Sequence, residues 1–290
     1  MIKRSHIRQF LAVVETGSFT QAAGRIRVTQ PTLSAGIADL ERMVGSRLFV
    51  RDRRHVRLTE AGGRFLPLAR ELDRNFRAVD GFGASAQGDW PALKLGVIRS
   101  VAAPLLEAVL AGLGEAFSIE LVEGTDSELR ASLASGRVDM MLGLIRDEDD
   151  GAIPLISEPY VLFVPSSHRL AGQAVAEPET LGSEVMIARR SCEVLDRTST
   201  FFTRLHVRPR FSLRSDSEER CMAMVAAGLG ITTAPLSHRR EGIEPVAIEG
   251  YDFARTLGLR ADPAWLTDER AAACRKVAVE IAERFAPEAR

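Results

Sequence analysis

Residues 10–45 read FLAVVETGSFTQAAGRIRVTQPTLSAGIADLERMVG, and this stretch decides the fold of the N-terminal part of the chain. Gly17 can end one helix, Ser18 can cap the next, and Ala22 and Ala23 let a neighbouring helix approach closely. Two helices joined by a short turn, with a preceding helix as support, describe a helix-turn-helix. Apolar residues recur at helical spacing on the first and third helices. They are Ile7, Phe10, Leu11 and Val14, then Leu33, Ile37, Leu40 and Val44.

The third helix of this pattern is the candidate for reading DNA. Thr29 or Gln30 caps it, and Pro31 lies in its first turn, where a missing N–H costs nothing. In a helix-turn-helix the start of this helix enters the major groove. A glutamine there can pair with both hydrogen-bonding atoms of adenine. We therefore predict a DNA-binding surface made of Gln30, Pro31, Thr32 and Ser34.

Two short apolar runs, at 48–50 and 56–58, flank a basic turn and are typical of a β-wing. Its arginines can neutralise phosphates or reach into the adjacent minor groove. We expect Arg51, Arg53, Arg54 and Arg57 to do so. Residues 1–80 carry 15 Lys and Arg against 8 Asp and Glu, whereas residues 81–290 carry 23 against 31. A basic N-terminal region in an otherwise acidic chain indicates that this region binds a polyanion.

These motifs resemble the LysR-type transcriptional regulators over about 60 residues without a gap. The matching positions are Phe10, Val13, Glu15, Gly17-Ser18-Phe19-Thr20, Ala22-Ala23, Thr29-Gln30-Pro31, Ser34, Ile37, Leu40-Glu41, Gly45, Leu48-Phe49, Arg51, Leu58-Thr59 and Ala61-Gly62. The resemblance implies a transcription regulator that binds a pseudo-palindromic site on double-stranded DNA and acts on RNA polymerase. The chain departs from the family at Ile26, conservatively, and at Ala35-Gly36, where many members carry a polar or basic pair. That second departure leaves the target sequence open.

Length and composition limit the other classes of protein. A chain of 290 residues with 46% hydrophobic and 27% charged residues predicts roughly two globular domains. The three cysteines form no CxxC pair, and the sequence contains no GxSxG, GxxxxGK[ST] or HExxH motif. We therefore expect no enzyme, no cofactor and no metal site. The longest uncharged stretch, 221–237, is too short for a membrane helix, so we expect a cytoplasmic protein with no membrane partner.

A long helix is predicted to follow the wing and link it to the rest of the chain. Its apolar residues recur at spacings close to a heptad seam. They are Ala61, Phe65, Leu68, Leu72, Phe76 and Val79. LysR-type regulators pair this helix with its copy in a second subunit, which implies a homodimer, and family members commonly form a homotetramer. The alternative is a helix that packs on its own domain.

From Leu93 onward, short β runs alternate with helices, which predicts α/β lobes with parallel sheets. The resemblance implies a two-lobed, periplasmic-binding-protein-like effector domain. We expect an α/β fold with an all-α, winged helix-turn-helix N-terminal domain at 1–58 and a dimerisation linker helix at 59–88. The effector domain follows at 91–290, with one lobe formed by 91–163 and 260–290 and the other by 164–259.

In such sheets, ligands lie at the carboxyl ends of the strands, near helix N-termini. This rule predicts an effector site that includes Ser100, Thr125, Ser191 and Cys192 between the lobes. Each of these residues can instead be a plain helix cap or a pocket wall. The neighbouring pair Arg189-Arg190 favours an acidic effector, unless it is simply solvated.

Cys192 also allows a second interpretation, in which the protein is a thiol-based redox regulator. It stands roughly where peroxide-sensing members of the family carry their reactive cysteine, and the nearby arginines can lower a thiol pKa. The expected resolving cysteine is absent, and Phe201 and Phe202 occupy that region. An unreactive pocket wall is therefore the preferred interpretation, and Cys221 and Cys274 are assigned to the core.

Overall fold

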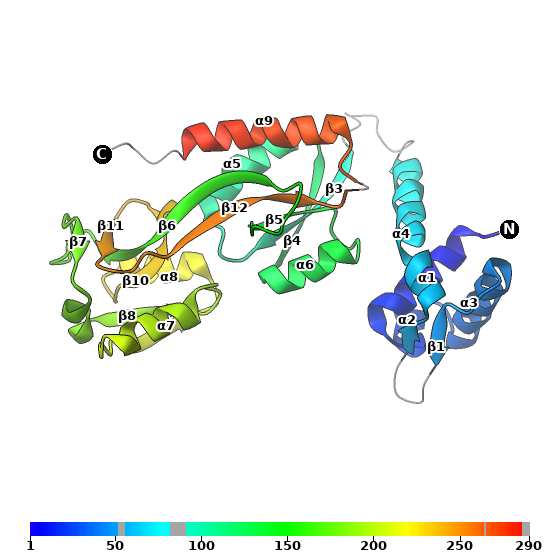
Figure 1. Cartoon of the computed structure of the whole chain (residues 1–290), viewed down its shortest axis with the longest axis horizontal. Coiled ribbons are helices and arrows are strands. Elements are labelled where there is room, and N and C mark those ends of the chain that lie inside the picture. The colour runs from blue at the N-terminus through cyan, green and yellow to red at the C-terminus, as the bar shows by residue number, and fades with distance from the viewer. Residues whose placement is uncertain (52–55, 82–90, 264, 286–290) are drawn as a thin grey trace. The chain divides into compact units, whose positions relative to one another are not determined.

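The computed structural model describes residues 1–51, 56–81, 91–263 and 265–285. It divides the chain into two compact units, Met1–Pro91 and Ala92–Arg290 (Figure 1). The first unit contains α1 (Arg4–Thr16), α2 (Phe19–Arg25), α3 (Gln30–Val44), β1 (Phe49–Arg51), β2 (Val56–Leu58) and α4 (Glu60–Gly81). In the part of the chain that is described, no helix combines the length and the apolar character that a membrane crossing needs.

The predicted helix-turn-helix is confirmed, with its caps. Gly17 takes the left-handed conformation after α1, at φ 62°, and the Ser18 side chain accepts from Gln21 N at the start of α2. Thr29 is the cap of α3. The rings of Phe10, Phe49 and Phe65 join α1, β1 and α4, with centroids 5.2 and 5.1 Å apart. The rest of the core lies among the three helices and includes Leu33, Ile37 and Leu40, all fully buried.

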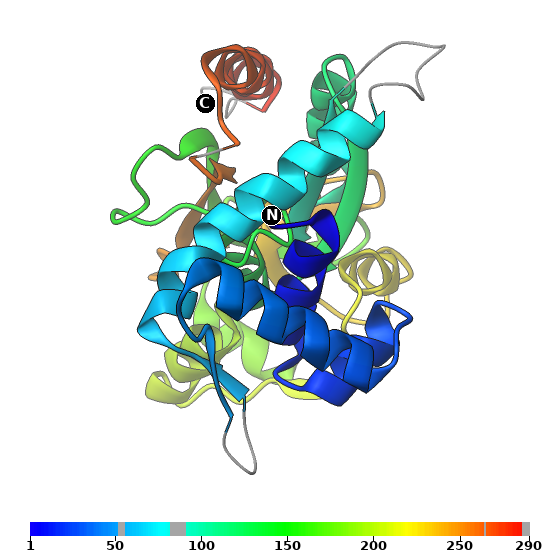
Figure 2. The same cartoon turned by 90° about the vertical axis from the view of Figure 1, so that its right-hand side faces the viewer.

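The wing is fastened to α3 through one carboxylate. Glu41 Oε1 accepts hydrogen bonds from the backbone N–H groups of Leu48, at 2.8 Å, and Phe49, at 3.1 Å. β1 and β2 pair antiparallel, from Phe49 opposite Leu58 to Arg51 opposite Val56. The orientation of the wing strands therefore follows from the position of α3 (Figure 2).

The apolar residues of α4 do not all face outward as one stripe that could pair with a second subunit, so that part of the expectation is wrong. Phe65 packs edge-on against Phe10, and Ala69 is fully buried in the same core. By contrast, Leu68 is 56% exposed and Val79 is 71% exposed, and Leu72 lies on the same stripe at 39%. An apolar residue that faces its own domain has the same spacing in the sequence as one that faces outward, because both recur with the helical period.

The second unit is built on an eight-stranded sheet with the order β4-β3-β5-β12-β6-β11-β7, and β10 pairs with β6. A separate parallel pair is formed by β8 and β9. The strands are β3 (Ala92–Ile98), β4 (Ser118–Gly124), β5 (Met140–Leu144), β6 (Ile153–Pro165), β7 (Val175–Ala176), β8 (Val185–Arg189), β9 (Arg210–Ser215), β10 (Thr232–Pro235), β11 (Ile243–Ile248) and β12 (Ala254–Ala261). The helices are α5 (Ala103–Gly114), α6 (Asp126–Ala134), α7 (Leu195–Arg204), α8 (Glu218–Ala226) and α9 (Asp268–Arg284), with short 3-10 turns at Pro178–Ser183 and Leu236–His238.

Two lobes share the long strands β6 and β12, which run antiparallel from one lobe to the other (Figure 1). The first lobe, with β3, β4, β5, α5, α6 and α9, has its own core, to which Leu155 and Leu257 contribute. The second lobe, with α7, α8 and β7 to β11, has cores that include Tyr160 and Phe163 from the other end of β6. The caps of α5 and α7 are Ala102 and Val194, so Ser100, Ser191 and Cys192 do not cap these helices.

Candidate functional site

The first turn of α3 presents polar side chains to solvent. Gln30, Pro31 and Thr32 are exposed, whereas Ser34 is half-buried. Gln30 Nε2 donates to Ser34 Oγ at 3.0 Å, and the hydroxyls of Thr29 and Thr32 lie 2.7 Å apart. These bonds are local and solvent-exposed, so base edges can replace them at little cost.

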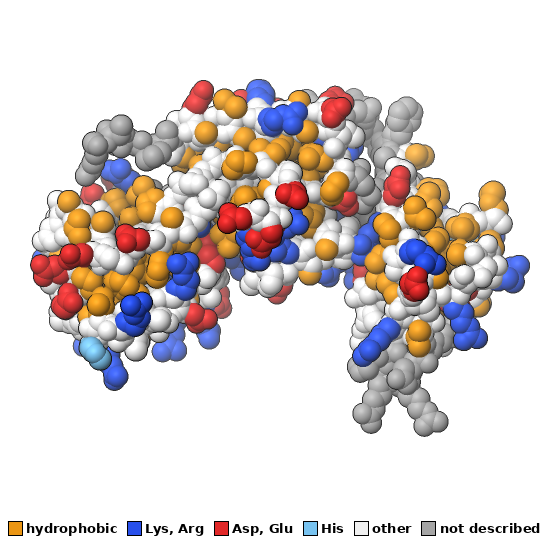
Figure 3. Space-filling model, viewed as in Figure 1, with side chains coloured by type: hydrophobic (Ala, Val, Ile, Leu, Met, Phe, Trp, Pro, Cys, Tyr) orange, Lys and Arg blue, Asp and Glu red, His pale blue; other side chains and the backbone are white. Residues whose placement is uncertain are grey.

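The basic wing is described only in part. Arg57 is exposed on β2, the side chain of Arg51 is not described, and Arg53 and Arg54 lie outside the described residues. Lys and Arg are the commoner charged groups on the face of Met1–Pro91 that Figure 3 shows. This agrees with the positive charge of the sequence of this unit and suits a surface that meets phosphates.

A buried set of polar residues, which we call the seam, joins the two lobes. Ser100 follows β3 in the first lobe and is 2% exposed. Its hydroxyl accepts from Arg255 Nη1 at 3.0 Å and donates to Glu193 Oε1 at 3.1 Å. Its carbonyl accepts from Arg255 Nη2 and from His238 Nε2, each at 3.2 Å. We define the seam as Ser100, Glu158, Glu193, His238 and Arg255.

Arg255 is the centre of the seam and is itself almost fully buried. Its Nε donates to Glu158 Oε1 at 2.9 Å, and its Nη1 donates to Glu193 Oε1 at 2.6 Å. Burial alone would lower the pKa of Arg255, but the two carboxylates outweigh it and the pKa rises. For Glu193, burial raises the pKa and Arg255 more than reverses this, so the pKa is lowered. Arg255 and Glu193 are therefore both charged at neutral pH.

His238 adds a neutral group to the seam. Burial, together with Arg189 and Arg255, holds the pKa of His238 well below its ordinary value. Because a carbonyl only accepts, Nε2 must carry the proton of the neutral ring in its contact with Ser100. The ring thus ties the 3-10 turn Leu236–His238 to the first lobe without adding a charge.

The other predicted effector residues do not join the seam. Thr125 caps α6 with Glu128 in a reciprocal capping box and is exposed. The Ser191 hydroxyl donates to the carbonyl of Asp216 at 2.8 Å. Of the four residues predicted, the structure places Ser100 in the seam and Cys192 in a cavity of the second lobe, while Thr125 bonds within its own turn and Ser191 bonds to the carbonyl of Asp216.

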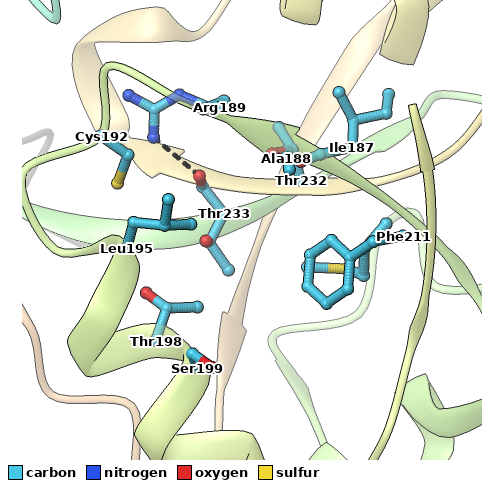
Figure 4. Close-up of a pocket in the computed structure, with 11 residues that line it drawn as sticks. Ile187, Ala188, Arg189, Cys192, Leu195, Thr198, Ser199, Phe211, Thr232 and Thr233 are labelled. Atoms are coloured by element: carbon cyan, nitrogen blue, oxygen red, sulfur yellow. Dashed lines mark hydrogen bonds between the residues drawn. The ribbon is translucent and has the colours of Figure 1, made fainter. Parts of the chain in front are cut away.

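The cavity beside Cys192 is small and lies within the second lobe (Figure 4). Its volume is about 30 Å³, which is enough to hold water but far below the volume of a typical ligand pocket. Figure 4 draws the Cys192 sulfur between the Arg189 guanidinium and Leu195. The Arg189 side chain pairs with Glu218 and donates from Nη1 to the Thr233 carbonyl at 2.8 Å. Its Nη2 has no partner among the described residues.

The environment of Cys192 favours the neutral thiol. Burial raises the pKa of Cys192, Arg189 opposes this, and the carboxylates of Glu193 and Glu218 support it. The net direction is upward, so the thiolate fraction at neutral pH is smaller than for a free cysteine. Cys221 and Cys274 are buried, as predicted, and burial raises the pKa of each thiol to about 11.

Sequence reasoning missed four of the five seam residues. Glu158 stands in the apolar strand β6, and Arg255 stands at the start of β12. A single charged residue inside an otherwise apolar strand is a usable signal, because a buried charge needs a partner. Glu193 and His238 carry no comparable signal, since Glu193 lies among the polar residues of the turn before α7 and His238 ends the short 3-10 turn Leu236–His238.

Comparison with known families agrees with both units. Residues 5–63 match the family model described as a bacterial regulatory helix-turn-helix protein of the lysR family. Residues 86–282 match the model of the LysR substrate binding domain. Together these matches span most of the chain.

Known proteins resemble the chain along most of its length. A probable hydrogen peroxide-inducible genes activator of Mycobacterium avium is 32% identical over 80% of this chain and 77% of its own. The regulator CatR of Pseudomonas putida is 30% identical over 84% of this chain and 87% of its own. A solved full-length OxyR variant of Pseudomonas aeruginosa shares the fold, with a TM-score of 0.60 and 24% identity over 97% of this chain and 95% of its own.

Proposed function

The chain belongs to the LysR family of DNA-binding transcriptional regulators, and from that premise we propose that it reads a pseudo-palindromic operator as a homodimer under the control of a small-molecule effector. The observation that carries the DNA-binding part is the exposed first turn of α3, with Gln30 and Thr32 at its surface. We assign DNA reading to residues 1–58, subunit pairing to the linker at 59–88, and effector response to 91–290.

The seam is the best place for the effector within the described part of the second unit. It brings side chains of both lobes into contact, so a ligand there can bind one arrangement of the lobes more tightly than another. A ligand shifts a conformational equilibrium only through such differential affinity. Ser100 would take part directly, and we retain Thr125, Ser191 and Cys192 as candidates at the margin of this site. In this proposal the shift alters DNA bending and the access of RNA polymerase.

Replacing Gln30 tests base reading. Gln30→Ala is expected to weaken binding to the operator by about 1–3 kcal/mol and to leave random DNA nearly unaffected, because only a matched base can bond to the amide. Fluorescence anisotropy with a genomic operator fragment and a scrambled duplex measures both affinities. The matched variant Arg57→Ala should weaken both duplexes alike and reduce the salt slope by about 0.9. Equal losses on both duplexes for Gln30→Ala would contradict base reading.

A redox response through Cys192 is the second candidate function. It is favoured by the peroxide-inducible activators among the relatives and by the position of Cys192 in a cavity beside Arg189. Against it stand the raised pKa of the Cys192 thiol and the burial of the other two cysteines. The effector-controlled regulator therefore remains the main proposal.

Cys192→Ser separates the two candidates. If the thiol is a cavity wall, the variant should regulate its target promoter like the wild type, with and without hydrogen peroxide, because serine nearly preserves the volume. Promoter output in cells measures this, with Cys221→Ser as the control for loss of a buried thiol. A peroxide response that is present in the wild type and lost only in Cys192→Ser would establish the redox alternative.

A further inference from the structure

Glu193 of the second lobe lies in the position that the carboxylate of a ligand would take between Ser100 and Arg255. We propose that these two residues form a carboxylate-binding site that the chain fills with its own Glu193, and that the effector is a carboxylic acid that displaces Glu193. This inference rests on the proposed effector control and names the chemical class of the ligand.

Arg255 and Ser100 are both held in place by residues other than Glu193. Arg255 is held by Glu158 at 2.8 and 2.9 Å, and Glu158 accepts from the backbone N–H of Ser237 at 2.6 Å. Ser100 is fixed through its carbonyl by Arg255 and His238. Removing Glu193 therefore leaves a buried hydroxyl and a buried guanidinium in place, both aimed at the position of its Oε1 atom.

The carboxylate of Glu193 leaves part of its hydrogen-bonding capacity unused in this site. Its Oε1 atom makes the bonds to Arg255 and Ser100, but its Oε2 atom is buried and completes no hydrogen bond among the described residues. The Tyr160 hydroxyl and the backbone N–H of Glu193 itself lie close enough to the carboxylate to lower its pKa, yet within the described part of the chain neither the Tyr160 hydroxyl nor Glu193 Oε2 completes a hydrogen bond of normal geometry. A ligand that bonds through both carboxylate oxygens gains what Glu193 lacks, since unpaired buried polar groups are costly.

Glu193 can also leave without unfolding a regular element. Residues 190–194 form turns between β8 and α7, and Glu193 lies next to the cap of α7 at Val194. Arg255 faces two carboxylates, those of Glu158 and Glu193, so a carboxylate ligand would restore the negative charge that the departing side chain removes. Displacement would break a link between the turn 190–194 and the first lobe.

Because Glu193 belongs to the same chain as the site, it competes strongly with any free ligand. An internal carboxylate competes at an effective concentration in the millimolar range or above. A simple monocarboxylate such as acetate should therefore fail against the wild type and should bind once Glu193 is shortened. The physiological acid must make further contacts in order to compete.

Acetate rescue tests this site in the full-length chain. Glu193→Ala leaves Arg255 with one partner fewer, and we expect the melting temperature of the second unit to fall by about 5 °C or more. Addition of 100 mM sodium acetate should raise it again by about 3 °C, because a ligand that binds only the folded state stabilises it. Sodium chloride at the same ionic strength should not do so, and the wild type should show no acetate-specific shift. Differential scanning calorimetry measures these melting temperatures.

Two further variants make the result specific. In Ser100→Ala combined with Glu193→Ala, the acetate shift should shrink to half or less, because one donor is gone. In Glu184→Ala, which removes the carboxylate that pairs with the half-exposed Arg169, acetate should have no more effect than chloride. If Glu193→Ala does not fold, Glu193→Ser also opens the site and retains a polar atom.

No acetate-specific shift in either Glu193 variant would overturn the proposal, as would an equal shift in Glu184→Ala. Operator binding by the same preparations keeps this outcome separate from the proposed function. A variant that binds its operator normally and ignores acetate contradicts the carboxylate site alone. Loss of operator preference in the wild type itself would contradict the proposed function.

Discussion

Gly62→Ala is expected to destabilise the DNA-binding unit by about 3 kcal/mol, whereas Gly63→Ala one residue later should be neutral or slightly stabilising. A Cβ atom at Gly62 would lie 2.1 Å from the carbonyl oxygen of Leu48 and 2.9 Å from the Leu58 side chain. A Cβ atom at Gly63 would meet nothing within 4 Å. Overpacking against backbone costs about 1–3 kcal/mol or more, while alanine improves an open helical position by about 0.5–1 kcal/mol.

The Leu48 carbonyl cannot move aside cheaply. It accepts from the backbone N–H of Thr59 at 3.0 Å, and the N–H of Leu48 is bonded to Glu41. A shift of this group therefore disturbs both the start of α4 and the wing. We also expect operator affinity to fall, because the arginines of the wing move with β1 and β2.

Hydrogen-exchange mass spectrometry on the full chain measures this effect where it arises. Peptides from α1 and α3 should lose protection in Gly62→Ala and keep it in Gly63→Ala, while peptides from the second unit should not change. Equal protection of α1 and α3 in the two variants would show that the close approach of Gly62 to Leu48 is not required.

The features that could be predicted from the sequence are local ones. Gly17, Ser18 and Thr29 act within one helical turn, so their capping roles are readable from neighbouring residues alone. The buried stripe of α3 is equally local, because a helical period identifies one face. The helix-turn-helix was predictable for this reason, and the family resemblance extended the fold prediction to the second unit.

The seam could not be predicted because its members are far apart in the chain. Arg255 lies 62 residues from Glu193, 97 from Glu158 and 155 from Ser100. Which of 39 acidic residues meets a given arginine depends on how the lobes pack, and no spacing rule encodes that. Ser100 was predicted because it follows a strand, whereas the same rule selected Thr125, which caps a helix and contacts its own turn.

Leu68→Asp combined with Leu72→Asp is expected to convert the proposed homodimer into monomers. These side chains form the outward stripe of α4 with Val79, while Phe65 and Ala69 face the core of their own domain. Two carboxylates from each subunit would meet across a pairing surface at this stripe, which is strongly unfavourable. Operator affinity should fall by about 100-fold or more, because the second half-site then no longer binds as part of the same molecule.

Light scattering coupled to size exclusion measures the mass, and binding to single and paired half-sites measures the loss of affinity. Val175→Asp with Val279→Asp is the matched control, because both residues are more than half exposed and lie in the second unit. The control should keep the wild-type mass and affinity. If the α4 variant keeps the mass of the dimer, the stripe is not the pairing surface. The assignment also fails if the variant becomes monomeric but still prefers paired over single half-sites as strongly as the wild type does. A single half-site should bind the monomeric variant and the wild type alike, since the reading surface of α3 is unchanged.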